Sequence, residues 1–242
     1  MKKILFSTTA FLSALTLSAQ PIEGTITYER KINMHRRMTD EQMKAMLPEF
    51  RTTKHQLLFS DSISLYKAMP EDITPDPFAS NGGGQVVMIR NAADGGEQFR
   101  NFSEAKAIES RELGAKTYLI EDTIKQQSWR LTDEIQIILN YTCKKATRQN
   151  ERGQTIDAWY SESIPCPAGP ENFASLPGAI LRLDINKGEI IFNAITISDK
   201  VNKNEIKEPK KGKKITRPEF MKMMEEMMGN PGPGGRMIRI GA

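Results

Sequence analysis

Apolar and polar side chains alternate along most of this chain, in short runs separated by turn residues. In residues 22–32, Ile22, Ile26 and Tyr28 fall on one side of the chain, and Glu23 and Glu29 fall on the other. A period of two with β-branched residues predicts a strand. Comparable runs predict further strands at residues 53–59, 62–67, 86–90, 98–102, 108–113, 117–121, 128–132, 135–146, 156–161, 179–185 and 189–197.

The residues between these runs predict how the strands are joined. Ser60 and Asp61 separate one pair of runs, and Asn186, Lys187 and Gly188 separate the last pair. Both pairs are therefore predicted to form hairpins. A spacing of about ten residues between runs favours an antiparallel sheet over strands joined by crossover helices.

Two segments carry the signals of helices. Thr39 and Gln42 have the spacing of a capping box at the start of the first, and Thr216 and Glu219 have it at the start of the second. The predicted helices cover residues 39–46 and 216–228.

These elements predict a mainly β protein. We expect a curved antiparallel sheet or half-barrel with a concave apolar face, as in periplasmic lipoprotein carriers. It would carry one or two short amphipathic helices and a flexible C-terminal tail. We divide the chain into a signal peptide at 1–19, an antiparallel β domain at 20–200, and a final part at 201–242. That final part holds a basic linker, a methionine-rich helix and a disordered tail.

The first 19 residues have the pattern of a cleavable signal peptide. Lys2 and Lys3 precede an uncharged apolar run from Ile4 to Leu17, and Ala19 is the small residue expected at the cut. The run is shorter than the roughly 20 residues that a membrane span needs, although an uncleaved anchor is the alternative. We therefore expect a periplasmic or secreted protein with no membrane span after cleavage.

Charge excludes one class of function. The 242 residues include 34 Lys and Arg against 30 Asp and Glu, for a net charge of +4. No basic stripe with interleaved aromatic side chains is present, so nucleic acid is not an expected partner.

The two cysteines, Cys143 and Cys166, leave two interpretations open. In an oxidising compartment an even number of cysteines favours a disulfide between them. The alternative is a pair of separate thiols.

Residues 129–185 hold several short motifs in a fixed order. They are Trp129, the run Asn140–Ala146, the run Ala158–Tyr160, the pair Ile164 and Pro165, the pair Gly169 and Pro170, and the run Leu176–Leu181. In this order and spacing they resemble the GLPGLI family of exported bacterial proteins, which is named for its Gly-Leu-Pro-Gly-Leu-Ile run. Ser175 stands where that run has its first Gly, and Ala179 stands where it has its second Leu. The resemblance implies no reaction, because that family has no established activity.

The residues that carry the resemblance form the first candidate site. They are Trp129, Tyr141, Cys143, Lys145, Ala146, Trp159, Tyr160, Pro165, Gly169, Pro170, Leu176, Pro177, Gly178, Ile180 and Leu181. Two interpretations stay open. The prolines and glycines stiffen a crossing loop while Leu176 and Ile180 fill the core beneath it, or the rigid loop is a docking surface.

Enzyme chemistry is not indicated by any motif. The two histidines, His35 and His55, are isolated, and the sequence has no nucleophile elbow, zinc motif or calcium loop. The methionines are unusual, because many of the 13 lie in two clusters. The C-terminal cluster is Met221, Met223, Met224, Met227 and Met228. Thioethers suit copper as Cu(I), but they also make adaptable apolar faces for packing.

We therefore predict an exported, non-enzymatic binding or assembly protein of the cell envelope with no cofactor. Its partner would be a cell-envelope protein or an apolar ligand. The alternatives are a periplasmic Cu(I)-binding protein that uses the methionine clusters and a hydrolase with an unrecognised site.

Overall fold

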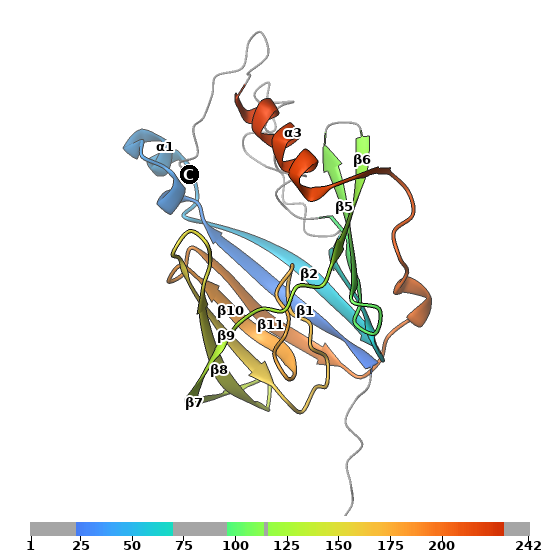
Figure 1. The fold of residues 1–242 in the computed structure, drawn as a ribbon. Helices are drawn as coiled ribbons and strands as arrows, with labels where there is room; N and C mark the ends of the chain where they lie inside the picture. Colours follow the sequence, from blue (N-terminus) through green and yellow to red (C-terminus); the bar gives the residue numbers. More distant parts are fainter. Residues whose placement is uncertain (1–22, 70–95, 114–115, 230–242) are drawn as a thin grey trace, which may run out of the picture.

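The described chain forms a single open β-sheet. The computed structural model describes residues 23–69, 96–113 and 116–229 (Figure 1). Twelve strands follow the order β12-β6-β5-β4-β3-β2-β1-β11-β10-β9-β8-β7. The strands are β1 Glu23–Asn33, β2 Phe50–Ser60, β3 Ile63–Ala68, β4 Gln98–Asn101, β5 Lys106–Leu113, β6 Lys116–Thr123, β7 Arg130–Ile138, β8 Tyr141–Gln149, β9 Thr155–Ser161, β10 Ala179–Ile185, β11 Ile190–Ser198 and β12 Lys213–Ile215.

Short helices complete the described part of the chain. They are α1 Glu41–Met46, α3 Arg217–Gly229 and the 3-10 turns η1 His35–Arg37 and η3 Lys203–Glu205. The mainly β prediction, with its curved antiparallel sheet and short helices, is confirmed. Figure 1 shows β5 and β6 rising at an angle to β1 and β2, with α3 beside them. The predicted signal peptide, the strand at 86–90 and the tail after residue 229 lie outside the described residues.

Most local predictions have a direct counterpart. β2 and β3 form the predicted hairpin, and β10 and β11 form the other, with Asn186, Lys187 and Gly188 all at positive φ. At α3 the capping box is present, because the Thr216 backbone N–H donates to the Glu219 carboxylate over 2.9 Å.

Two local predictions were wrong. Asp40 replaces Thr39 as the cap of α1, since its carboxylate accepts the backbone N–H of Gln42 over 2.8 Å. The single long strand predicted after residue 135 is instead the end of β7, a turn and β8. Leu139 and Asn140 form that turn at φ values of 48° and 66°.

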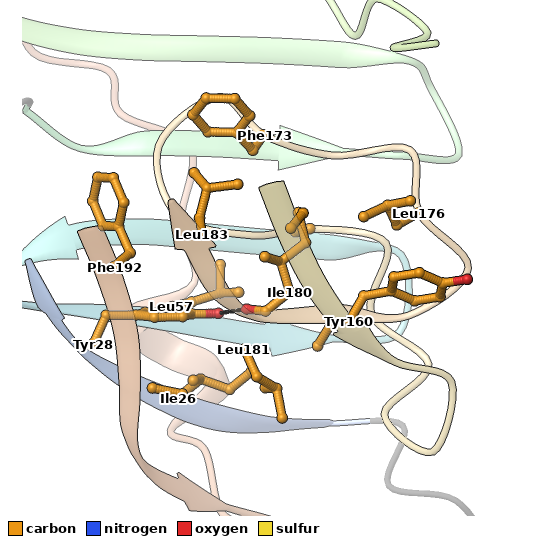
Figure 2. Packing of buried hydrophobic residues seen from close by; sticks show 14 of the residues in the cluster. Ile26, Tyr28, Leu57, Tyr160, Phe173, Leu176, Ile180, Leu181, Leu183 and Phe192 are labelled. Atoms are coloured by element: carbon orange, nitrogen blue, oxygen red, sulfur yellow. Dashed lines mark hydrogen bonds between the residues drawn. The ribbon is translucent and has the colours of Figure 1, made fainter. Parts of the chain in front are cut away.

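Two segments cover the same side of the sheet, which we call the inner face. The loop between β9 and β10, residues 162–178, lies over the strands around β1, and α3 lies over β5 and β6. Under the loop the main core gathers apolar side chains from β1, β2 and β8 to β11. Tyr28 crosses this core and donates its hydroxyl to the Ile180 carbonyl over 2.6 Å, as Figure 2 shows. The loop therefore seals one half of the inner face.

The other half of the inner face is closed by α3. Phe220 packs edge-on against Tyr118 with ring centroids 6.1 Å apart, and Leu113 and Ile120 complete this smaller cluster. β12 adds a short parallel strand to the edge of β6. On the opposite face of the sheet, Ile206 covers Leu58, Leu65 and Phe99. No helix in the described ranges has both the length and the apolar character needed to cross a membrane.

Candidate functional site

The inner face changes from apolar to charged across β4, β5 and β6. Side chains two residues apart share one face of a strand. Register then places Gln98 opposite Glu109, and Ala107 opposite both Arg100 and Asp122. These positions continue the row that holds Tyr28 on β1 and Tyr66 on β3. The polar side chains therefore lie between the loop 162–178 and α3, where neither segment fully covers the sheet.

A pocket of about 230 Å³ opens over these polar side chains. We call it the inner-face pocket. Its floor comes from β4, β5 and β6, its walls come from the chain after β6 and from the loop before β10, and Arg217 lies at the start of α3. The lining residues are Gln98, Phe99, Arg100, Ala107, Ile108, Glu109, Ile120, Asp122, Thr123, Ile124, Lys125, Gln127, Asn172, Ala174 and Arg217.

Hydrogen bonds hold the two walls together. Gln127 donates its side-chain amide to the Asn172 carbonyl over 2.7 Å and accepts the backbone N–H of Ala174 over 3.3 Å. The Trp129 indole N–H donates to the Ala174 carbonyl over 2.9 Å. The wall that follows β6 is therefore fixed to the loop that follows β9.

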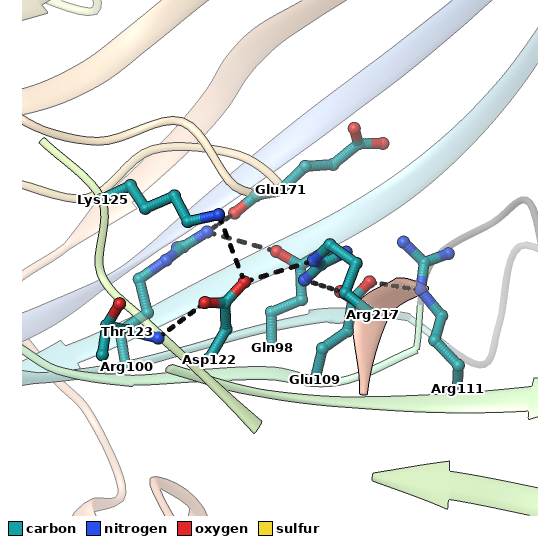
Figure 3. A network of polar contacts seen from close by, with 9 residues as sticks. All are labelled: Gln98, Arg100, Glu109, Arg111, Asp122, Thr123, Lys125, Glu171 and Arg217. Carbon is teal, nitrogen blue, oxygen red and sulfur yellow. Dashed lines mark hydrogen bonds and ion pairs between the residues drawn. The ribbon is translucent and has the colours of Figure 1, made fainter. Parts of the chain in front are cut away.

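Each carboxylate of the inner-face pocket already has a cationic partner, as Figure 3 shows. Glu109 pairs with Arg111 and with Arg217, whose Nη2 lies 2.8 Å from Oε2. Asp122 lies 3.4 Å from Arg217 Nε and 3.9 Å from Lys125 Nζ. Burial raises the pKa of the Glu109 carboxyl, but the attraction of Arg111 and Arg217 outweighs burial and leaves that pKa below its ordinary value.

This cluster predicts an acid-dependent contribution to stability. A carboxyl whose folded pKa is lowered stabilises the fold above its unfolded pKa, and it loses that contribution as pH falls through the folded pKa. We expect Glu109→Gln to lower the free energy of unfolding by about 2 kcal/mol at neutral pH. The difference should shrink below a pH of about 4. Urea unfolding at both pH values measures it, with the exposed Glu112→Gln as control. An equal loss at both pH values would contradict the account.

Arg100 differs from the other charged side chains of the inner-face pocket. It is 5% exposed, and its Nη2 donates to the Gln98 amide oxygen over 3.2 Å and to the Glu171 carbonyl. Its Nη1 is buried and has no acceptor among the described residues. Burial lowers the pKa of Arg100 to about 10, against the attraction of Glu109. Burying a cation whose donor has no hydrogen-bond acceptor lowers the stability of the fold, so Arg100 is a candidate for a functional role.

A second hollow of about 330 Å³ lies on the opposite face of the sheet. Thr25, Gln56, Lys200 and Glu205 are among its lining residues. None of its lining residues carries a buried polar side-chain atom without a partner in the described structure. This hollow therefore lacks the feature that marks the inner-face pocket.

The residues singled out in the sequence lie in or against the main core. Cys143, Ala146, Tyr160, Leu176, Ile180 and Leu181 are buried in it, with Trp129, Tyr141 and Trp159 packed at its border. Lys145 lies over the Trp159 ring, 5.8 Å from its centroid, and pairs with Glu134 at 2.9 Å. Pro165, Gly169, Pro170, Pro177 and Gly178 belong to the covering loop. The structure therefore gathers these residues as packing around one loop.

The predicted disulfide is absent, because both cysteines are buried free thiols. Cys143 lies on β8 and donates to the Tyr141 carbonyl over 3.5 Å. Cys166 lies in the covering loop, where its ionised thiolate form would interact electrostatically with Arg100 and Tyr28. Burial raises the pKa of Cys143 to about 11 and that of Cys166 to about 12. Neither thiol is therefore suited to act as a nucleophile.

Two of the C-terminal methionines contribute packing. Met223 and Met224 pack against the small cluster that contains Tyr118 and Phe220, whereas Met221 is 56% exposed. The side chains of Met227 and Met228 lie outside the described part of the structure. No group of three His, Cys, Asp or Glu side chains that could hold a metal occurs in the described ranges.

Sequence reasoning missed the inner-face pocket. The apolar pattern predicts strands at 98–102, 108–113 and 117–121, but it does not show which of their charged residues share a face. The signal in the sequence is a period of two. It places Gln98 and Arg100 on one face of their strand with Phe99 on the other, and it places Glu109 and Arg111 on one face with Ser110 on the other. Placing Asn172 and Arg217 beside them requires the tertiary fold.

This chain is similar to part of an N-glycanase. The family model described as N-glycanase peptide, N-terminal domain matches residues 100–220, half of the chain. Two solved structures of PNGF-II, in space groups C2 and P21, share the fold with TM-scores of 0.57 and 0.58 at 14% identity. They cover 85% and 87% of this chain, which spans only 33% and 34% of theirs.

Other comparisons add little to this likeness. An uncharacterized conserved protein from Thermus thermophilus has a TM-score of 0.41 at 7% identity, over 81% of this chain and 91% of that one. No curated protein matches the chain.

The family match overturns the resemblance to the GLPGLI family and the function drawn with it. The misleading motifs are core and turn residues, which β proteins of different families share because packing and turns demand them. The prediction of a cell-envelope binding or assembly protein was therefore wrong, and so was the alternative of a Cu(I)-binding protein.

Proposed function

Because the chain belongs to the family described as N-glycanase peptide, N-terminal domain, we propose that it takes part in the processing of N-glycosylated proteins and contacts the sugar of such substrates. The chain spans about a third of PNGF-II, so we propose contact with the substrate and not the complete reaction. Its ligand in this proposal is a glycan-bearing polypeptide.

One observation carries the proposal. The matched segment, residues 100–220, contains every lining residue of the inner-face pocket except Gln98 and Phe99. The family likeness and the candidate site therefore coincide on the same elements. The matched segment also includes the loop 162–178, which forms one wall of that pocket.

The chemistry of the inner-face pocket suits a sugar. Hydroxyl groups both donate and accept hydrogen bonds, and amide, carboxylate and guanidinium side chains offer matching partners. Gln98, Gln127 and Asn172 supply amides, and Asp122 and Arg217 supply charged groups. A volume of about 230 Å³ lies below the roughly 300 Å³ at which sites for larger ligands begin, so the pocket has room for about one sugar unit.

We also propose that the chain works outside the cytoplasm, in the periplasm or as a secreted protein. The pattern of residues 1–19, with Lys2, Lys3 and an uncharged apolar run, supports this location. We do not propose nucleic acid as a partner.

A matched pair of substrates tests the proposed function. One glycoprotein with N-linked glycans and the same protein with its glycans removed would be titrated separately into the chain. We expect the glycosylated form to bind at least about 10-fold more tightly, which corresponds to about 1.4 kcal/mol. Glu205→Gln, in the hollow on the opposite face, should not change this ratio. Equal affinity for both forms would contradict the proposal.

A further inference from the structure

Arg100 is a buried cation without a carboxylate partner in the described structure. Its two contacts, with the Gln98 amide oxygen and the Glu171 carbonyl, are both to neutral acceptors and both use Nη2. Its Nη1 makes no hydrogen bond within the described residues, although the side chain forms part of the inner-face pocket. A guanidinium presents donors in a planar fork that matches a carboxylate.

The carboxylates near Arg100 are engaged elsewhere. Glu171 pairs with Arg30 over 3.2 Å, and Glu109 and Asp122 both pair with Arg217. Figure 3 shows Arg100 at the end of this row, between Glu171 and Gln98. The charge that Arg100 lacks must therefore come from outside these residues if it is to be matched.

We propose that the inner-face pocket binds the carboxylate of an acidic sugar through Arg100, with the ring hydroxyls against the surrounding amides and charged groups. This inference rests on the proposed function, since it names the class of sugar that the same pocket takes. Lys125, whose side chain is 77% exposed, lies at the rim and favours entry of an anion. The small volume limits the bound part to about one ring.

Two variants separate ligand binding from folding. Arg100→Met removes the guanidinium and keeps an apolar stem. Gln98→Glu is nearly isosteric and gives Arg100 a permanent carboxylate beside the contact that it already makes at 3.2 Å. Both variants should lose the acidic sugar, and the melting temperature of each variant checks that it remains folded. Arg148→Met, at a cation that lies over Trp129 and does not line the pocket, is the matched control.

The probes are glucuronate and glucose, which differ in one carboxylate. Isothermal titration with the full chain should give glucuronate at least about 10-fold tighter binding than glucose, and each pocket variant should remove that preference. Equal binding of the two sugars by the unmodified chain, or an unchanged preference in Gln98→Glu, would overturn the inference. N-acetylaspartate is a third probe, which carries the carboxylate of an acidic peptide residue in place of that of a sugar. If it binds more tightly than glucuronate, the acidic sugar is the wrong source.

This test fails separately from that of the proposed function. A chain that prefers the glycosylated protein but not glucuronate keeps the proposed function and loses the acidic sugar. A chain that binds glucuronate through Arg100 but does not distinguish the two glycoprotein forms keeps the acidic-sugar site and loses the proposed function.

Discussion

Gly178→Ala should destabilise the protein by about 3 kcal/mol, because the new methyl group has no room. Its carbon would lie 2.0 Å from the Ser161 carbonyl oxygen and 2.6 Å from the carbonyl carbon. Both atoms are backbone, at the point where Ala179 pairs with Ser161 in the register of β9 and β10. Relieving this steric clash would therefore require β9 and β10 to separate where the covering loop joins β10.

Gly153→Ala is the control for this prediction. Gly153 has a φ of +75° and no atom within 4 Å of the added carbon, so only backbone strain opposes the change. That strain is about 1 kcal/mol. Urea unfolding of both variants compares the two causes. A loss for Gly178→Ala no larger than that for Gly153→Ala would contradict the close approach of β9 and β10.

Phe192→Ala should cost about 3–5 kcal/mol of the free energy of unfolding. Phe192 is fully buried in the main core, and truncation leaves a cavity there. Its ring also supports the Arg30 guanidinium, which lies 5.6 Å from the ring centroid and pairs with Glu171. Because the Glu171 carbonyl accepts from Arg100, the loss should also loosen the inner-face pocket.

A more exposed position on the same strand provides the control for the cavity. Ile195 lies on β11 and is 36% exposed, so Ile195→Ala should cost less than about 1.5 kcal/mol. Chemical denaturation measures both variants. Similar losses at the two positions would contradict the burial assigned to Phe192.

Strands with a regular alternation could be predicted from the sequence because each carries its signal locally. The hairpin at Asn186–Gly188 is of this kind, since its residues tolerate positive φ. The turn at Leu139 was not predictable in this way. Leucine rarely adopts positive φ. Asn140 is the turn-favouring residue beside it, and one such residue is a weak signal inside an apolar run.

β12 and the inner-face pocket depend on contacts between distant parts of the chain. β12 has three residues and pairs with β6 in parallel, from Lys213 with Tyr118 to Ile215 with Ile120. Residues 213–215 alone resemble a charged linker. The same return of the chain brings Arg217 to Glu109, so neither the strand nor the ion pair has a local signature.

The motifs of residues 129–185 predicted the wrong family because most of their residues pack in the core or shape the covering loop. Leu176 in the covering loop and Ile180 on β10 are both buried in the main core. Buried residues of this kind indicate how the core packs. Arg100 and Asn172 line the inner-face pocket, and neither belongs to a motif.

The central claim is that a glycan contacts the inner face of the sheet. NMR chemical shifts of the isotope-labelled chain, recorded during titration with one N-glycosylated peptide and with the same peptide lacking the sugar, test it most directly. We predict that only the glycosylated peptide shifts the amides of Arg100, Glu109, Asp122 and Asn172, which surround the inner-face pocket. Equal shifts with both peptides, or shifts confined to the hollow around Gln56 and Lys200 on the opposite face, would contradict the account.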